Sequence, residues 1–243
     1  KPDVLIHCAA MANVDACEAD PALARQVNAE LPGTIAAVCS QRGVRMIHIS
    51  TDAVFDGQKG NYREEDAPNP LSVYAKTKLD GENAVLANNP DALITRVNFY
   101  GWSAAGNRSL AENFVHKLEA GKEMMGFTDV IFCPMNILDL SALLVDVAEM
   151  DLNGIYHMVG SEAMSKYQFG VSIAETFGYD AGLIKPVSVS DSGLKAARSP
   201  NLSLSIDKLK NALGHDMPDF SEGLKKFYDQ HRRGYPQYIK SLA

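Results

Sequence analysis

The sequence predicts an α/β fold built on a doubly wound parallel sheet, and two features of the chain support this class. Along the first hundred residues, apolar runs of strand length alternate with longer amphipathic segments. The apolar runs are nearly continuous, which is typical of parallel strands covered by helices on both faces.

The expected elements follow one another in strand–helix order. Strands are predicted at 4–10, 44–50 and 92–101, and helices at 21–43, 71–88 and 110–121. In the first helix, apolar residues recur every three or four positions. Gly43 is placed to end that helix, because glycine readily adopts the left-handed conformation of a helix C-terminus.

Beyond about residue 103 the alternation loosens. Shorter segments are expected as smaller mixed α/β pieces beside the main sheet: 155–160, 166–178, 183–190 and one amphipathic helix at 220–240. No linker rich in Pro, Gly or Ser separates the two parts. The sequence therefore predicts two interleaved domains, 1–150 with the main sheet and 151–243 as a mainly substrate-binding lobe.

Composition excludes several classes of function. Lys and Arg total 23 against 30 Asp and Glu, a net charge of −7, which argues against a nucleic-acid surface. Because no apolar run approaches the roughly 20 residues that span a bilayer, no membrane segment is expected. The four cysteines have neither zinc-site spacing nor the density of a disulfide scaffold. They are expected as reduced thiols in a cytoplasmic protein.

Polar side chains end the second predicted strand. Ser50, Thr51 and Asp52 follow the apolar run "VRMIHI" directly. Ligands of open parallel sheets bind beyond the carboxyl ends of the strands, so these side chains are candidates for a binding crevice. The alternative is local turn chemistry, in which Thr51 or Asp52 bonds nearby backbone amides.

Tyr74 and Lys78 lie four residues apart on the following predicted helix, which places them on one face. An ammonium near a phenol is expected to lower the pKa of the phenol toward the range of a general acid. Lys76 lies on a different face and is expected to be solvent-exposed. The alternative is a surface tyrosine with solvated lysine neighbours.

His7 and His48 lie within apolar strands. We expect them to pack in the sheet rather than to bind a metal, because no Cys/His cluster accompanies them.

Four motifs occur in a family-specific order: "HCAAMANVDACE", "HISTDAVFDG", "NPLSVYAKTKLDGE" and "TRVNFYG". Together they resemble the extended short-chain dehydrogenase/reductases, most closely the dTDP-4-dehydrorhamnose reductases. The resemblance is specific over about residues 2–101. It implies a Rossmann-like fold and an NADPH- or NADH-dependent reduction of a 4-keto group on a nucleotide-linked deoxysugar.

The resemblance also implies roles for the predicted site. Tyr74 would protonate the sugar carbonyl, and Lys78 would bind the nicotinamide ribose and tune Tyr74. Thr51 would bond the carbonyl or position the nicotinamide, as the third catalytic residue. Residues expected at the cofactor are Ala9, Ala10, Ser50, Tyr74, Lys78 and Asn98.

Substrate contacts are expected from Asp52, Phe99 and Pro134, where the chain partly departs from the family. Ala53 stands where these reductases usually carry Tyr, and Phe99 lies near their usual Trp. Pro134 is what remains of their "GSPT" loop. These departures leave the reaction class intact and weaken the case for rhamnose as the sugar.

A glycine-rich turn that receives the cofactor pyrophosphate opens such a fold, and nothing like it is present in this sequence. We therefore expect the first strands of the nucleotide-binding sheet to be missing, and this shortened chain to bind dinucleotide poorly and to be inactive by itself.

Two alternatives stay open: another sugar-nucleotide epimerase or dehydratase of the same family, and a non-catalytic regulatory subunit resembling that of methionine adenosyltransferase. The sequence does not fix the sugar, the nucleotide, or the choice between NADH and NADPH. The resemblance further raises Mg²⁺ as an associated ion and a homodimer as the assembly, without locating a site for either.

Overall fold

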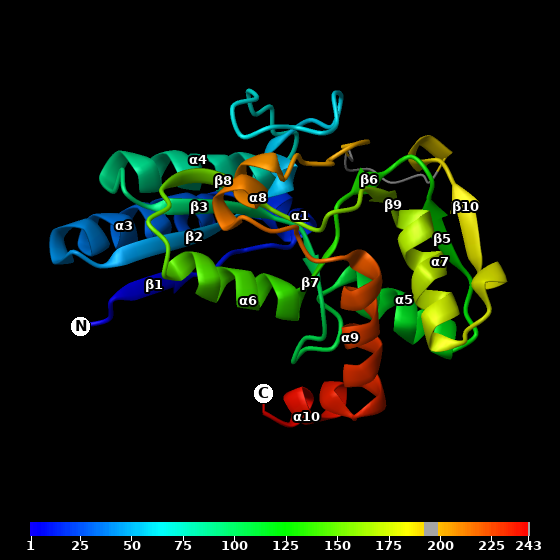
Figure 1. Ribbon diagram of the computed structural model, residues 1–243. Helices are drawn as coiled ribbons and strands as arrows, with labels where there is room; N and C mark the ends of the chain where they lie inside the picture. The colour runs from blue at the N-terminus through cyan, green and yellow to red at the C-terminus, as the bar shows by residue number, and fades with distance from the viewer. Residues whose placement is uncertain (192–198, 243) are drawn as a thin grey trace. The chain divides into compact units, whose positions relative to one another are not determined.

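The computed structural model describes residues 1–191 and 199–242 (Figure 1). They form two compact units that alternate along the chain. The first contains Lys1–Val97, Leu143–Met158 and the described part of Lys195–Gly214. The second contains Asn98–Ala142, the described part of Val159–Leu194 and of His215–Ala243. The division into domains at residue 150 stays a prediction.

A parallel sheet forms the centre of the first unit and confirms the expected fold class. Its strand order is β1 (Val4–His7), β2 (Arg45–Thr51), β3 (Leu93–Val97) and β8 (Gly154–Met158). All five residues of β3 are buried, as expected for a strand covered on both faces.

Helices connect these strands in the predicted places. Between β1 and β2 lie α1 (Val14–Ala19), α2 (Pro21–Arg25), the π-helix η1 (Gln26–Glu30) and α3 (Leu31–Arg42). Gly43 ends α3 with a φ of 56°, as the sequence predicted. Between β2 and β3 lie the 3₁₀ turn η2 (Asp52–Val54) and α4 (Val73–Asn88).

Close approach of backbones holds α4 against the preceding helices. Figure 1 shows α3 and α4 running side by side along the sheet. A Cβ added at Gly81 would lie 2.2 Å from the carbonyl oxygen of Asn28. A Cβ added at Gly33 would lie 2.9 Å from the Cβ of Ala84. Both glycines therefore allow a helix separation that a larger residue would prevent, and this fixes where α4 presents its side chains.

One prediction about this sheet was wrong. Residues 155–160 were expected to belong to the smaller lobe, but β8 pairs with β3 as the fourth parallel strand, with Ile94 opposite Ile155. The first two residues of that apolar run are only half-buried, because β8 lies at the edge of the sheet. A short edge strand after the long excursion through the second unit carries no periodicity that ties it to the sheet. The first unit also contains α8 (Asp207–Leu213).

Short strand pairs and helices make up the second unit. The pairs are β4 (Phe99–Tyr100) with β7 (Met135–Asn136), β5 (Met124–Phe127) with β10 (Ile184–Val187), and β6 (Ile131–Phe132) with β9 (Met164–Ser165). The helices are α5 (Leu110–Glu119), α7 (Lys166–Phe177), α9 (Phe220–Arg232) and α10 (Tyr235–Ser241), with 3₁₀ turns η3 (Ala181–Leu183) and η4 (Val189–Asp191). Helix α6 (Ile137–Ala148) contributes to both units.

Aromatic side chains dominate the core of the second unit. The rings of Trp102 and Phe227 stack with centroids 4.2 Å apart, and the Trp102 indole N–H donates to the Phe227 carbonyl. Phe169 contacts Tyr100, Phe114 and further rings edge-on. Aromatic pairs of this kind add to the stabilisation from buried area.

The single helix expected at 220–240 is two helices, so this prediction was also wrong. Gly234 separates α9 from α10 with a φ of 71°. This left-handed conformation interrupts an α-helix.

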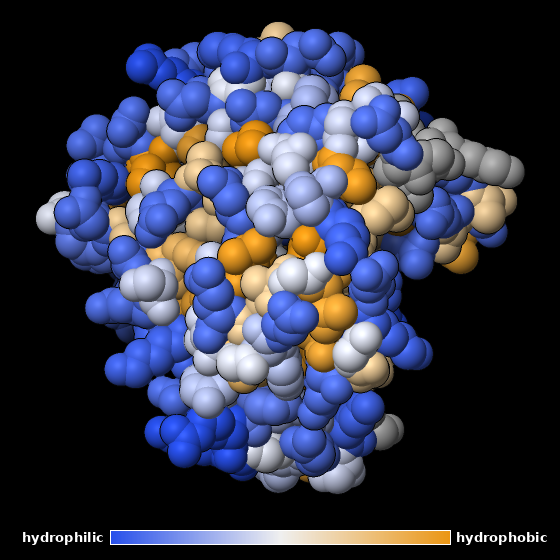
Figure 2. Space-filling model, turned by 90° about the vertical axis from the view of Figure 1, so that its right-hand side faces the viewer, coloured by the Kyte–Doolittle hydropathy of each residue, from blue (hydrophilic) through white to orange (hydrophobic). Residues whose placement is uncertain are grey.

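Polar side chains cover most of the face in Figure 2, and apolar side chains appear there in smaller groups between them. Among the described residues, no helix is long and apolar enough to cross a bilayer.

Candidate active site

The carboxyl end of β2 and the turn after it supply three polar side chains. Ser50, Thr51 and Asp52 are all buried. The Thr51 hydroxyl accepts the backbone N–H of Ala53 at 3.2 Å and donates to Asp52 Oδ1 at 3.1 Å. The local turn hydrogen bonds that the alternative interpretation expected are therefore present. They fix the Thr51 side chain next to Asp52.

The first turns of α4 supply the tyrosine and the lysine. Ser72 caps the helix by accepting the N–H of Ala75, and Glu18 accepts the N–H of Val73 at 2.8 Å. These two acceptors satisfy backbone donors that a helix N-terminus leaves free. Tyr74 therefore starts from a fixed backbone, one turn before Lys78.

A cavity of about 200 Å³ lies between these two segments. Thr51, Asp52 and Tyr74 share it, so the structure brings three of the predicted residues together. Ala53 also lines it, where a larger side chain would take up space. The described residues that line it are Val14, Thr51, Asp52, Ala53, Leu71, Ser72, Tyr74, Ala75, Ser199 and Leu202.

Lys78 is almost completely buried, with 2% of its surface exposed. Its ammonium donates to the Ile49 carbonyl at 2.7 Å and lies 3.4 Å from Nε2 of His48. Burial lowers the pKa of Lys78 to about 8, and the carboxylate of Glu82 partly opposes that shift. Lys76 is exposed, as predicted.

Tyr74 does not have the lowered pKa that the sequence suggested. Burial raises the pKa of Tyr74 to about 12, with a smaller contribution in the same direction from Asp52, while a hydrogen bond with Thr51 lowers it. The expectation was wrong because burial of the phenol outweighs the other effects, and the Lys78 ammonium is directed to Ile49 and His48. Tyr74 consequently keeps its proton at neutral pH, the state that a proton donor needs.

Ser50 is tied into a buried ionic network that the sequence analysis missed. Its hydroxyl donates to Glu82 at 2.5 Å, and Glu82 pairs with Arg96 at 2.8 Å. Both charged side chains are nearly inaccessible to solvent, at 1% and 2% exposure. An arginine inside the apolar run of β3 and a glutamate one turn after Lys78 were the available signals, since buried charges require partners.

The remaining predicted residues lie elsewhere in the chain. Ala9 and Ala10 follow the end of β1 after one intervening residue and are exposed. Asn98, Phe99 and Pro134 belong to the second unit. There the carbonyl of Asn98 accepts the N–H of Met135 at 3.1 Å, and Phe99 is 48% exposed. Their roles stay predictions.

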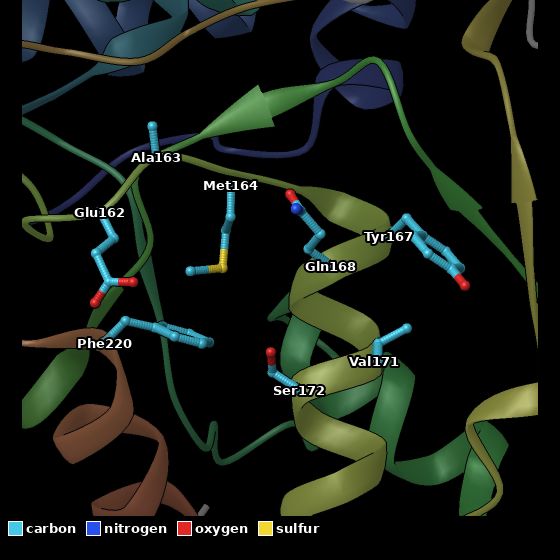
Figure 3. Close-up of a pocket in the computed structure, with 8 residues that line it drawn as sticks. All are labelled: Glu162, Ala163, Met164, Tyr167, Gln168, Val171, Ser172 and Phe220. Atoms are coloured by element: carbon cyan, nitrogen blue, oxygen red, sulfur yellow. The ribbon is translucent and has the colours of Figure 1, made fainter.

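A separate open pocket of about 410 Å³ lies in the second unit (Figure 3). Met164 and Phe220 point into it, with the Gln168 amide and the Ser172 hydroxyl beside them. It contains none of the predicted catalytic residues. Among the residues that the structure describes, no group of three or more His, Cys, Asp or Glu side chains is arranged to hold a metal ion.

Two buried histidines of the sheet predict a loss of stability in mild acid. Burial lowers the pKa of His48 to about 2 and that of His157 to about 3, from 6.5. As pH falls below 6.5, the unfolded chain therefore takes up protons that the folded chain does not.

Urea unfolding at pH 7 and pH 5 should show a decrease in the free energy of unfolding of about 2 kcal/mol for each of these histidines. The variant His157→Asn should lose the part of this pH dependence that His157 contributes and keep the part from His48. Equal stability at both pH values would contradict the buried neutral state of the two rings.

Comparisons with known proteins show which family the chain is similar to. Residues 1–233 match the model of the RmlD substrate binding domain family. The probable low-salt glycan biosynthesis reductase Agl14 of Haloferax volcanii is 36% identical over 91% of this chain and 75% of its own length. Methionine adenosyltransferase 2 subunit beta of Pongo abelii is 34% identical over 93% of this chain and 70% of its own.

Solved structures show the same fold. A dTDP-4-dehydrorhamnose reductase of Clostridium acetobutylicum superposes with a TM-score of 0.88 at 31% identity, covering 95% of this chain and 81% of that one. A dTDP-4-dehydrorhamnose reductase of Bacillus anthracis, solved in complex with NADP, gives 0.87 at 27% identity, covering 94% and 81%. With its parallel sheet, its Tyr74–Lys78 helix and this match over nearly its whole length, the chain belongs to the RmlD substrate binding domain family.

Proposed function

We propose that this protein reduces a 4-keto group on a nucleotide-linked deoxysugar with NADPH or NADH, as a dTDP-4-dehydrorhamnose reductase does. The observation that carries the proposal is Tyr74, a protonated phenol that is hydrogen-bonded to Thr51 and lines a cavity with Asp52. The similarity to proteins named as reductases supports the same reaction class.

The residues present fit a dinucleotide at this site. Lys78 has three N–H groups, of which one donates to the Ile49 carbonyl and one faces His48. We assign the third to a ribose hydroxyl of the cofactor, and we assign Ala9 and Ala10, which are exposed, to a backbone contact with the cofactor. When bound, the reduced nicotinamide supplies the hydride.

In this mechanism Tyr74 donates its proton to the carbonyl oxygen as negative charge develops there. Thr51 orients the phenol through their hydrogen bond, which lowers the pKa of Tyr74 and so favours loss of its proton. Lys78 would hold the cofactor from one turn further along α4. Asp52, Phe99 and Pro134 would contact the substrate, and Ser50 and Asn98 would support the cofactor. A homodimer, a cytoplasmic location and an association with Mg²⁺ belong to the same proposal.

A non-catalytic role is the second candidate, because one relative is named as a subunit of methionine adenosyltransferase. The complete set of Thr51, Tyr74 and Lys78 favours catalysis over that role. Tightly retained NAD in the purified protein would instead favour an epimerase or dehydratase.

The two lysines of α4 test the proposed role of Lys78. In the natural protein, Lys78→Met should weaken NADPH binding and lower kcat/KM for dTDP-4-dehydrorhamnose by at least about 100-fold, because it removes a buried charge beside the proton donor. Lys76→Met, on the same helix but exposed, should change neither. Equal effects of both substitutions on fluorescence titration and turnover would refute the assignment.

A further inference from the structure

Two buried histidines form a contact that the proposed mechanism does not use. His7 of β1 lies opposite His48 of β2 in the sheet register. Their Nδ1 atoms are 3.0 Å apart, and the rings stack with centroids separated by 5.1 Å. His7 is 6% and His48 0% exposed. The other ring nitrogen of His48 is the one that faces Lys78. The three side chains therefore form one row from α4 to the edge strand β1.

The charge of Lys78 fixes where the protons of this row lie. An ammonium group can only donate, so Nε2 of His48 must accept and cannot carry a proton. A neutral His48 then has its proton on Nδ1, which donates to Nδ1 of His7. His7 in turn carries its proton on Nε2, an atom that is buried and has no hydrogen-bond partner among the described residues.

The surroundings keep both rings neutral. Burial lowers the pKa of both histidines, and the charge of Lys78 lowers each further. Glu82 is the ionised group that raises the pKa of Lys78. Its carboxylate also accepts the Ser50 hydroxyl and forms an ion pair with Arg96.

Other charged or titratable groups surround α4 without joining the row. Asp52 of η2 and Cys17 of α1 act on Tyr74, and the carboxylate of Glu18 on α1 accepts the N–H of Val73. Arg25 and Glu30 of α2 and η1 are well exposed.

We propose that His48 is a positioning residue for Lys78, and that His7 holds His48 in the tautomer that accepts from the ammonium. With two N–H groups directed to Ile49 and His48, the direction of the third is set by tetrahedral geometry. The inference rests on the proposed function, in which that third N–H serves the cofactor. The inference also explains why two histidines lie inside an apolar sheet. Burying a polar ring costs free energy unless hydrogen bonds compensate for it.

The tautomers can be measured without cofactor or substrate. Long-range ¹H–¹⁵N spectra of the natural protein labelled at histidine, recorded at pH 7, should show His48 protonated on Nδ1 and His7 protonated on Nε2. A proton on Nε2 of His48 at this pH would overturn the proposal.

The pKa of Lys78 provides the second readout. His48→Phe removes the acceptor and should lower that pKa by about one unit, followed through the ε-carbon resonance of labelled lysine. His48→Gln supplies an amide oxygen as acceptor and should restore most of the shift. His157→Phe is the matched control, because it removes another fully buried histidine of the same sheet that does not contact Lys78. An unchanged Lys78 pKa in folded His48→Gln and His48→Phe chains would count against positioning.

Turnover separates this inference from the proposed function. His48→Phe should lower kcat by about tenfold, shift its pH profile and leave KM for the sugar nearly constant, whereas His157→Phe should leave the pH profile in place. An active natural protein with the opposite tautomers would overturn the positioning role alone. An inactive natural protein with the expected tautomers would overturn the reductase function. It would also overturn the assignment of the third Lys78 N–H to the cofactor.

Discussion

Tyr74→Phe should reduce kcat/KM for a 4-keto sugar nucleotide by 10² to 10⁴, the range that a positioned proton donor contributes. The phenol is the protonated group that lines the cavity with Thr51 and Asp52, and its raised pKa keeps the proton available at neutral pH. Phenylalanine preserves the ring and removes only the hydroxyl. NADPH affinity should therefore change little, since Lys78 and the backbone beyond β1 are untouched.

Steady-state kinetics and fluorescence titration of the natural protein measure the two effects separately. Tyr156→Phe serves as the matched control, because it removes the hydroxyl of another half-buried tyrosine of the first unit that lies outside the cavity. Turnover by Tyr74→Phe close to that of Tyr156→Phe would show that Tyr74 is not the proton donor.

Glu82→Gln should lower the free energy of unfolding by about 3–5 kcal/mol, the usual cost of breaking a buried ion pair by removing one partner. The substitution leaves the Arg96 guanidinium inside the protein without its counter-charge, and weakens the acceptor that Ser50 uses. It should also lower the pKa of Lys78 further, because the Glu82 carboxylate raises that pKa.

The same helix offers the control for this loss of stability. Asp80 pairs with Arg25 at 3.5 Å, but both side chains are about half or more exposed, at 47% and 62%. Asp80→Asn should therefore cost less than about 1 kcal/mol in urea unfolding. If the two substitutions cost the same, the buried network is not a major source of stability in the first unit.

The parts of the fold that could be predicted are those with strong local signals. Gly43 ended its helix as expected, and the four-residue spacing placed Tyr74 and Lys78 on α4 with Lys76 exposed. The polar end of β2 was recognisable because side chains at that edge of a parallel sheet face the ligand crevice.

Other features depend on tertiary contacts that no spacing reveals. The pKa of Tyr74 follows mainly from burial, and the contacts of the Lys78 ammonium with Ile49 and His48 come from a different element. The place of β8 in the sheet depends on where the chain returns after about 55 residues in other elements. The Glu82–Arg96 ion pair joins α4 to β3, so the sequence around either residue alone could not predict it.

Binding and turnover by the natural protein test the central claim most directly. Its intact mass should be determined first, followed by titration with NADPH and by NADPH oxidation in the presence of dTDP-4-dehydrorhamnose, with this 243-residue chain measured beside it. The account predicts saturable NADPH binding and substrate-dependent oxidation by the natural protein that is abolished in Tyr74→Phe. A natural protein that neither binds NADPH nor oxidises it with this or other 4-keto sugar nucleotides would contradict the reductase function and favour a binding role.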